Sequence, residues 1–155
     1  DVWTDYRKDM ISKSGIALFM FGNKLKEGKI VESNGMFEEF DICVKNNVVP
    51  IAIGMTGYVS KSLWDDITAG MDKYYPKNQE LRDAIIKLGD YSLSHDEIIT
   101  NIIKAVGILQ KNWGISRKVF YSFHFDDDNW RAGQIRNIGA LENDKPIRLK
   151  DLIAA

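Results

Sequence analysis

Cysteine and histidine are nearly absent from this chain. It contains one cysteine, Cys43, and two histidines, His95 and His124, which are far apart in the sequence. A single cysteine excludes an internal disulfide, and this usage predicts a reducing, cytoplasmic setting. Zinc sites draw mainly on cysteine and histidine ligands, so we predict no bound metal. We expect Cys43 to pack as a small core residue rather than to act as a nucleophile.

The chain also lacks an excess of charge of either sign and lacks a long apolar run. The formal net charge is −1, from 21 basic and 22 acidic residues. Binding to nucleic acid or to an anionic membrane therefore has no bulk electrostatic support. No apolar run approaches the ~20 residues that cross a bilayer, and no signal peptide is visible. Because the sequence begins at Asp1 rather than at methionine, we expect a fragment or a processed product.

The glycine-rich phosphate motifs are missing too, since neither G-x-G-x-x-G nor the P-loop lysine motif occurs. Two continuous apolar runs are present instead, at residues 16–21 and 48–54. Such runs are typical of strands covered on both faces. The long connection between them predicts a parallel pair with a right-handed crossover. Pro50 removes a ladder donor from the second run, which disfavours a central position for that strand.

Helical periodicity surrounds these two runs. Met36, Phe40 and Val44 fall on one stripe of a helix that begins near Asn34. Ser94 and Glu97 have the spacing of a capping box at the start of another helix. The polar segment 24–33 is predicted to be a loop. Strands alternating with helices predict an α/β fold built on a parallel sheet. The full set of predicted helices is 5–13, 34–45, 61–71, 78–88 and 95–110.

Small and polar residues follow each apolar run and form the first candidate site. In open α/β sheets, ligands bind beyond the carboxyl ends of the strands. Gly35 opens the connecting helix, whose free N–H groups and positive dipole end suit a phosphate. The candidates are Gly22, Asn23, Ser33, Gly35, Glu38, Glu39, Thr56 and Gly57.

Two interpretations of these residues stay open at this point. In the functional one, Asn23 and Thr56 hydrogen-bond ribose hydroxyls, Lys24 adds charge, and Glu38 or Glu39 holds a ribose edge. In the other, the glycines are turn residues and the glutamates are ordinary partners of the helix dipole.

The same residues resemble a known family. Tyr6-Arg7 precedes an apolar strand ending in Gly22-Asn23, and Ser33-Asn34-Gly35, Glu38-Glu39-Phe40 and Thr56-Gly57-Tyr58 follow. This pattern, over about residues 3–110, resembles the back half of a SLOG domain. SLOG domains are the Rossmann-like group that includes the LOG and Smf/DprA proteins. The type most similar is attached to sirtuin or TIR domains in bacterial antiphage systems such as Thoeris.

The resemblance implies a nucleotide pocket to which Arg7 also contributes. It implies no tightly bound cofactor, with NAD or a cyclic ADP-ribose type nucleotide as the ligand. Two departures are visible: the first corner reads Gly-Asn instead of Gly-Gly, and the first strand with its own glycine loop is absent. A LOG-type phosphoribohydrolase would instead use an arginine and a glutamate in catalysis, for which Arg7 and Glu39 are the candidates.

A third apolar run, 119–125, ends at three aspartates. Ser122 and His124 lie on one face of the predicted strand because side chains alternate. Residues 116–137 resemble the first strand and helix of a Thoeris-type TIR domain, which is flavodoxin-like. The candidate residues here are Ser122, His124, Asp126 and Arg131. The catalytic glutamate of TIR enzymes lies further downstream, and the spacing of Glu142 does not match it, so no catalytic residue is assigned.

These observations predict an α/β chain with a Rossmann-like parallel sheet and flanking helices, followed by the first β-α unit of a TIR domain. The predicted parts are a SLOG-like domain at 1–110, a linker at 111–116 and a TIR-like part at 117–155. The expected function is sensing of a nucleotide-derived signal in antiphage defence, coupled to the TIR-like effector. The alternatives are an NAD-consuming TIR enzyme or nucleotide hydrolase, and a TIR-type module that forms homo-oligomers without catalysis.

Overall fold

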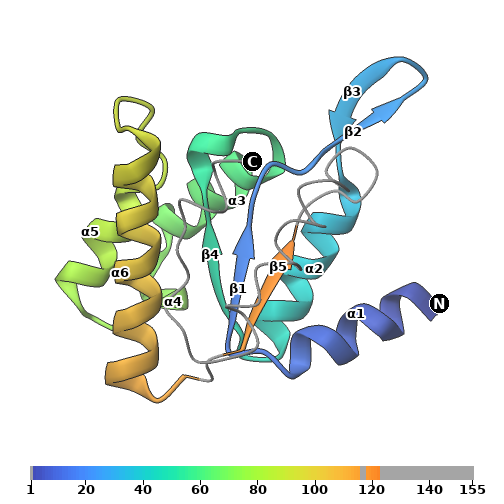
Figure 1. Ribbon diagram of the computed structural model, residues 1–155. Helices are drawn as coiled ribbons and strands as arrows, with labels where there is room; N and C mark the ends of the chain where they lie inside the picture. Colours follow the sequence, from blue (N-terminus) through green and yellow to red (C-terminus); the bar gives the residue numbers. More distant parts are fainter. Residues whose placement is uncertain (1, 116–117, 123–155) are drawn as a thin grey trace.

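The computed structural model describes residues 2–115 and 118–122, which form an α/β unit around a three-stranded parallel sheet. The strands are β1 (Ile16–Phe19), β4 (Val49–Ala52) and β5 (Val119–Ser122), in the order β4-β1-β5. Helices flank the sheet, with α1 and α2 on one side of it in Figure 1 and α5 and α6 on the other. The predicted Rossmann-like fold class is confirmed.

The helices follow the apolar stripes closely. The helix predicted after Asn34 is α2, and it buries Met36 and Phe40. The predicted capping box is also confirmed, since Ser94 and Glu97 exchange both of its hydrogen bonds at the start of α6. The helices are α1 (Val2–Ser12), α2 (Asn34–Lys45), α3 (Tyr58–Ala69), α4 (Met71–Tyr74), α5 (Gln79–Lys87) and α6 (His95–Trp113), with a 3₁₀ turn, η1 (Gly54–Thr56).

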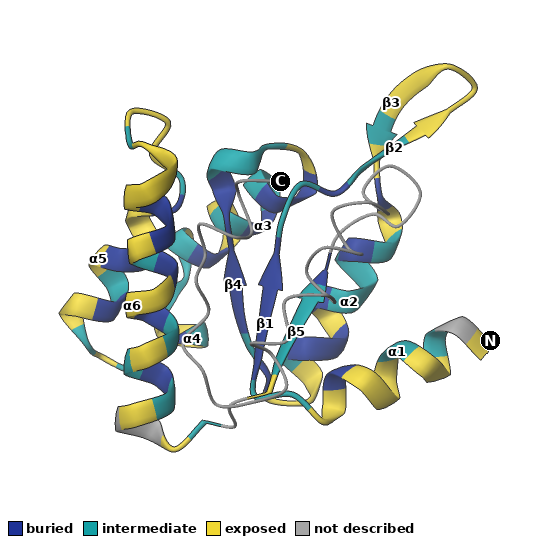
Figure 2. Ribbon diagram, in the orientation of Figure 1, coloured by how far each residue is buried: buried dark blue, intermediate teal, exposed yellow. Residues whose placement is uncertain are grey.

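The central strand lies at the core. All four residues of β1 are buried, as expected for a strand with a neighbour on each edge and helices over its faces. Phe19 packs edge-on against Phe40 of α2. Figure 2 shows β1 and β4 as largely buried strands, with exposed residues on the outer helix faces, in connecting turns and on a protruding hairpin.

That hairpin corrects one prediction, because the segment 24–33 is not a loop. It forms the antiparallel strands β2 (Asn23–Lys26) and β3 (Lys29–Glu32). Glu27 and Gly28 between them have φ values of 52° and 74°, as a two-residue type I′ turn requires. Leu25 and Ile30 face each other across the pair and are 63% and 61% exposed. The hairpin packs little against the core, so its sequence has few apolar residues from which a strand could be predicted.

Pro50 lies in β4, at an edge of the sheet, as its missing donor requires. Val49 and Ile53 donate backbone hydrogen bonds toward β1. Backbone polar groups of successive strand residues point to opposite edges, so the nitrogen and carbonyl of Pro50 point away from β1. Its carbonyl accepts a hydrogen bond of 2.6 Å from the buried hydroxyl of Tyr75. At Pro50 the outer edge of the sheet therefore has no free donor, and its acceptor is covered.

Several boundaries differ from the predictions, three of them near the site or the predicted linker. The first strand ends at Phe19 rather than at residue 21, because Phe21 adopts φ 59° and starts a turn. Helix α3 begins at Tyr58, before the predicted 61, and α6 continues to Trp113, inside the segment predicted as a linker. Strand β5 lies beside β1 in the same sheet. Residues 123–155 lie outside the described part, so the TIR-like domain stays a prediction.

Candidate functional site

The carboxyl ends of the three strands lie at one level of the sheet. Phe19, the last residue of β1, is opposite Ala52 of β4 on one edge and Ser122 of β5 on the other. The turns after β1 and β4 and the start of α2 therefore gather at this end, where ligands bind in open α/β sheets. The turns that carry the first set of sequence candidates therefore lie at this end of the sheet.

Gly22 makes close packing of the first turn feasible. Its φ is 95°, and a Cβ placed there would lie 2.7 Å from both Met36 Sδ and Val59 Cβ. Because real Cβ atoms do not approach other atoms so closely, only glycine fits between α2 and α3. Gly22 also accepts a backbone hydrogen bond of 2.7 Å from Ser33 N–H, which fixes the entry to α2. The role of Gly22 in the structure is thus to hold the two helices against the turn.

Thr56 joins the turns after the two strands. Its hydroxyl donates to the Ile53 carbonyl at 2.7 Å and accepts from the Phe21 N–H at 2.8 Å. A hydroxyl has one donor and two acceptor positions, so only one acceptor position remains for a ligand. Ser60, which the sequence analysis did not single out, has a similar role: its buried hydroxyl bonds to the carbonyls of Phe19 and Ile53.

The remaining turn candidates line the same end of the sheet. Ser33 is the N-cap residue of α2, is buried, and makes no side-chain cap hydrogen bond. Asn23 lies half-buried at the base of the hairpin, with Lys24 beside it. Gly57 has φ 76° and open space around its Cβ position. These residues thus lie in the turns at this end of the sheet.

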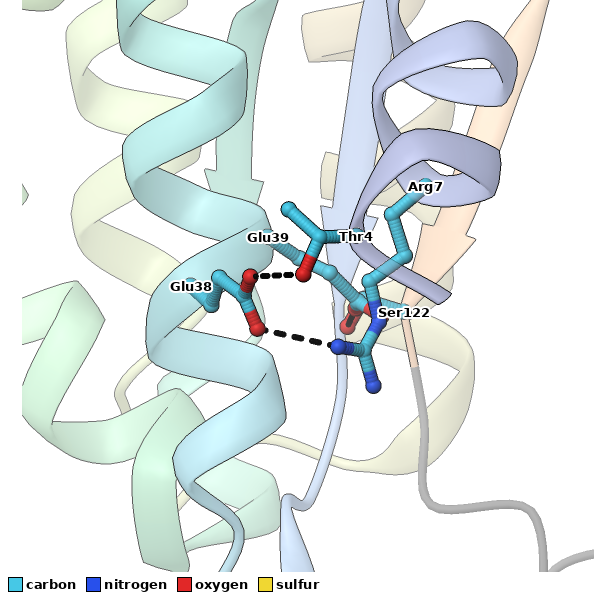
Figure 3. A network of polar contacts seen from close by, with 5 residues as sticks. All are labelled: Thr4, Arg7, Glu38, Glu39 and Ser122. Carbon is cyan, nitrogen blue, oxygen red and sulfur yellow. Dashed lines mark hydrogen bonds and ion pairs between the residues drawn. The ribbon is translucent and has the colours of Figure 1, made fainter. Parts of the chain in front are cut away.

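A polar network between α1, α2 and β5 is the main feature of the site (Figure 3). Arg7 Nη1 lies 2.9 Å from Glu38 Oε2, and Arg7 Nε lies 3.1 Å from Glu39 Oε1. Thr4 of α1 donates to Glu38 Oε1 at 2.9 Å. Ser122, at the end of β5, donates to Glu39 Oε2. One guanidinium thus bridges two neighbouring carboxylates, and each carboxylate has a second, hydroxyl partner.

Gly35 places Arg7 at the start of α2. A Cβ on Gly35 would lie 3.0 Å from Arg7 Nη2, which is tighter than nearly all real contacts. Absence of a side chain at Gly35 therefore lets the guanidinium approach the helix start, where the dipole already favours anions. A cation and a helix N-terminus converge on one spot, which suits a phosphate more than either would alone.

Glu38 and Glu39 differ in environment. The side chain of Glu38 is 41% exposed, whereas that of Glu39 is 15% exposed. Burial raises the pKa of Glu39 above its ordinary value, although the hydrogen bond from Ser122 and the charge of Arg7 act in the opposite direction. Glu39 is therefore a shielded hydrogen-bond acceptor, and its protonation is sensitive to changes in the network.

Several sequence predictions concern other kinds of site. Cys43 is fully buried and its pKa is raised to about 12 by burial, as expected of a core thiol. Among residues 2–115 and 118–122, no group of three or more acidic, histidine or cysteine side chains is placed to hold a metal ion. No described helix is long and apolar enough to cross a bilayer. His124, Asp126 and Arg131 lie outside the described residues.

The network contains two residues whose roles were not foreseen in the sequence. Thr4 precedes Arg7 by one helical turn, which is the only signal that it faces the same partner. Ser122 was assigned to a separate TIR-like strand end, whereas it contacts Glu39 across 83 positions of sequence. No local pattern indicates such a long-range pair.

Comparison with known proteins adds independent information. Residues 1–109 match the profile of STALD, the Sir2- and TIR-associating SLOG family. A protein named NAD(+) hydrolase ThsA from Cytobacillus dafuensis is 44% identical over 110 residues, which are 71% of this chain and 22% of that protein. Proteins of the same name from Bacillus cereus (strain MSX-D12) and Enterococcus faecium are 35% and 33% identical over 108 and 110 residues. The match covers 69% and 71% of this chain, and 23% of each of those two relatives.

Proposed function

Because the chain belongs to the Sir2- and TIR-associating SLOG family, we propose that it senses a nucleotide-derived signal in bacterial antiphage defence. The ligand is a cyclic ADP-ribose type nucleotide or NAD, as the resemblance to defence-system SLOG domains implies. The relatives named NAD(+) hydrolase ThsA support an NAD-derived ligand. Since the match spans less than a quarter of those relatives, the hydrolase activity in their name is not carried over to this chain.

The observation that carries the proposal is the guanidinium of Arg7 held between Glu38 and Glu39 at the start of α2. A pyrophosphate needs a cation and free N–H groups, and a ribose needs acceptors for its hydroxyls. This site offers both within one turn of α2. In the proposed complex Arg7 and the α2 N-terminus bind phosphate, and Glu38 and Glu39 accept from ribose hydroxyls.

The turn residues complete the proposed pocket. Asn23, Ser33 and the remaining acceptor position of Thr56 contribute polar contacts, and Gly22, Gly35 and Gly57 let the ligand approach the backbone.

Isothermal titration calorimetry of this chain, and of a longer form extended at both ends, with cyclic ADP-ribose isomers, ADP-ribose and NAD tests the sensor. We expect binding that Arg7→Ala and Glu39→Gln weaken by at least about tenfold, as loss of a charge-assisted contact does. Arg82→Ala and Glu80→Gln are matched controls, since both side chains form ion pairs away from the site. Absence of binding by the extended form would contradict the proposal.

A second candidate function rests on Glu39. A buried carboxylate with a raised pKa beside an arginine is the arrangement of a general acid or base. A LOG-type hydrolase would use Arg7 and Glu39 to cleave a nucleotide. Chromatography of each nucleotide after incubation with the protein separates the two: intact ligand favours the sensor, and a product lost in Glu39→Gln favours the hydrolase.

The whole protein is proposed to couple this sensor to a TIR-like effector that begins near residue 117. Such an effector would act in the cytoplasm, either as an NAD-consuming enzyme or as a surface for homo-oligomer assembly. An extended form that includes the full TIR-like segment distinguishes these options. NAD loss on addition of a cyclic ADP-ribose isomer indicates an enzyme, and ligand-dependent oligomers without NAD loss indicate assembly.

A further inference from the structure

Strand β5 lies outside the region that the family profile matches. The match ends at residue 109, and β5 begins at Val119. Even so, β5 supplies the third strand of the sheet and places Ser122 on Glu39. One wall of the candidate site therefore comes from a segment that is not part of the matched domain.

Among the strands that the structure describes, β5 lies at an edge of the sheet. Gly15 N–H donates to the Lys118 carbonyl at 2.9 Å, and Met20 N–H donates to the Ser122 carbonyl at 3.1 Å. Val119, Phe120 and Tyr121 are only half-buried, whereas their partners Ile16 and Ala17 are fully buried. Strands with less buried apolar surface open at a lower free-energy cost than the strands at the centre of a core.

Ser122 fills one acceptor position of Glu39 Oε2, which a ligand hydroxyl could otherwise use. Arg7 contacts Glu39 Oε1, and the Ser122 hydroxyl contacts Glu39 Oε2. A serine hydroxyl on a shielded carboxylate has the chemistry of a ribose hydroxyl on the same carboxylate. While β5 is paired with β1, Glu39 Oε2 already accepts a hydrogen bond from Ser122.

We propose that the β1 edge and Glu39 form a strand-binding surface from which β5 is displaceable, and that β5 and the nucleotide compete for Glu39. With β5 bound, the Ser122 hydroxyl donates to Glu39 Oε2 and competes with any ligand hydroxyl for that oxygen. With β5 displaced, Glu39 Oε2 is free for a ligand hydroxyl. The competition with a nucleotide rests on the proposed function, whereas the displacement of β5 does not.

Hydrogen exchange of the full chain without ligand tests the displacement. The amides of Gly15 and Met20 bond to the β5 side, and those of Val49 and Ile53 bond β4 to β1. If β5 opens separately, the first pair exchanges at least about tenfold faster than the second pair. Equal protection of the two pairs would overturn the proposal whatever the ligand results are.

Competition is tested with the serine hydroxyl removed. In calorimetric titrations with cyclic ADP-ribose isomers and ADP-ribose, Ser122→Ala should bind about fivefold more tightly than the wild type, because no hydrogen bond to Glu39 has to be broken. Thr100→Ala, which removes an exposed hydroxyl on α6, should leave the affinity unchanged. Equal or weaker binding by Ser122→Ala would refute competition, and weaker binding would make Ser122 a ligand contact.

A last measurement keeps the two proposals apart. Gly15 precedes β1, at the end of the sheet opposite the site, so a bound nucleotide does not cover its amide. Ligand that displaces β5 should therefore speed exchange at Gly15 in the wild type. Fast exchange at Gly15 with no binding of any nucleotide supports the displaceable strand and contradicts the sensor. Tight binding with even protection supports the sensor and contradicts the displaceable strand.

Discussion

At the scale of single residues, the site depends on what is missing as much as on what is present. Gly22 and Gly35 each leave out a side chain where another group needs the room. At Gly22 that group is the packed pair Met36 and Val59, and at Gly35 it is the Arg7 guanidinium. The first glycine is required for folding and the second for placing charge.

Replacing Gly22 with alanine should lower the free energy of unfolding by about 2–4 kcal/mol, the sum of overpacking and positive-φ strain. Urea unfolding followed by circular dichroism measures it. Gly28→Ala is a matched control, since its φ is also positive and nothing lies within 4 Å of the new methyl group. It should cost only about 1 kcal/mol. An equal loss of unfolding free energy at both positions would show that the positive φ, and not the close packing at Gly22, causes the destabilisation.

Glu39 makes a pH-dependent contribution to stability. Its pKa is raised in the folded state, mainly by burial, so the folded chain holds the proton more tightly than the unfolded chain. The free energy of unfolding therefore falls as the pH rises through the interval above the ordinary value of 4.5. Arg7 and Glu38 face this carboxylate, and Ser122 donates to it.

Glu39→Gln removes this titration. Relative to the variant, the wild type should lose stability as the pH rises above the ordinary carboxyl pKa of 4.5, because glutamine binds no proton. Urea unfolding across that interval measures the difference. Glu80→Gln is the control, because Glu80 is an exposed glutamate that pairs with Lys104 away from this network. A wild type that gains stability with pH relative to Glu39→Gln would mean that Arg7 and Ser122 outweigh burial.

At the scale of elements, the two edges of the sheet are built differently. β4 is covered at Pro50, which has no donor and whose carbonyl accepts from the Tyr75 hydroxyl. β5 pairs with β1 through its backbone, but its side chains are mostly half-buried. The sealed edge belongs to the matched family region and the loosely held strand does not. Edge strands commonly need such protection against pairing with other chains.

Tyr75→Phe tests the sealed edge. Loss of the hydroxyl leaves the buried Pro50 carbonyl without this partner, so the free energy of unfolding should fall by about 1–3 kcal/mol. Tyr74→Phe is the neighbouring control, because Tyr74 is less buried and lies in the same aromatic cluster. Thermal and urea unfolding of both variants give the comparison. A larger loss in Tyr74→Phe would contradict the sealing role.

The sequence predicts those elements whose apolar faces are wide and continuous. The buried run at β1, the stripe of α2 and the Ser94 capping box all correspond to the structure, because burial and capping leave local patterns. The hairpin escaped prediction, since Leu25 and Ile30 are exposed and interrupted by charges. The start of the predicted helix pointed to Glu38 and Glu39, and the resemblance to SLOG domains pointed to Arg7. The contact of Glu39 with Ser122 depends on tertiary pairing that no local pattern encodes.

At the scale of the whole molecule, one thiol reports on the integrity of the core. Cys43 is the only cysteine in the sequence, lies on the buried face of α2, and has its pKa raised to about 12. Any reagent that labels it must wait for the core to open. Labelling therefore measures opening of the sheet and helices together.

We expect iodoacetamide at about pH 8 to label the native chain at least about a hundredfold more slowly than the chain in guanidinium, because both burial and the raised pKa oppose reaction. Mass spectrometry gives the rates at this single position. A nucleotide that binds the folded state should slow labelling further by mass action. Rapid labelling in native buffer would mean that α2 leaves the core readily.

The closure of β4 at Pro50 has a consequence for symmetry. Two copies of this chain cannot share a continuous sheet through their β4 edges, because Pro50 offers no N–H and its carbonyl is already bonded. A two-fold axis that extends the sheet must therefore pass on the other side of β1. It would relate each copy's strand there to the same strand of its partner, antiparallel to itself. The choice of edge in any such assembly is thus influenced by one proline and one tyrosine on the opposite edge.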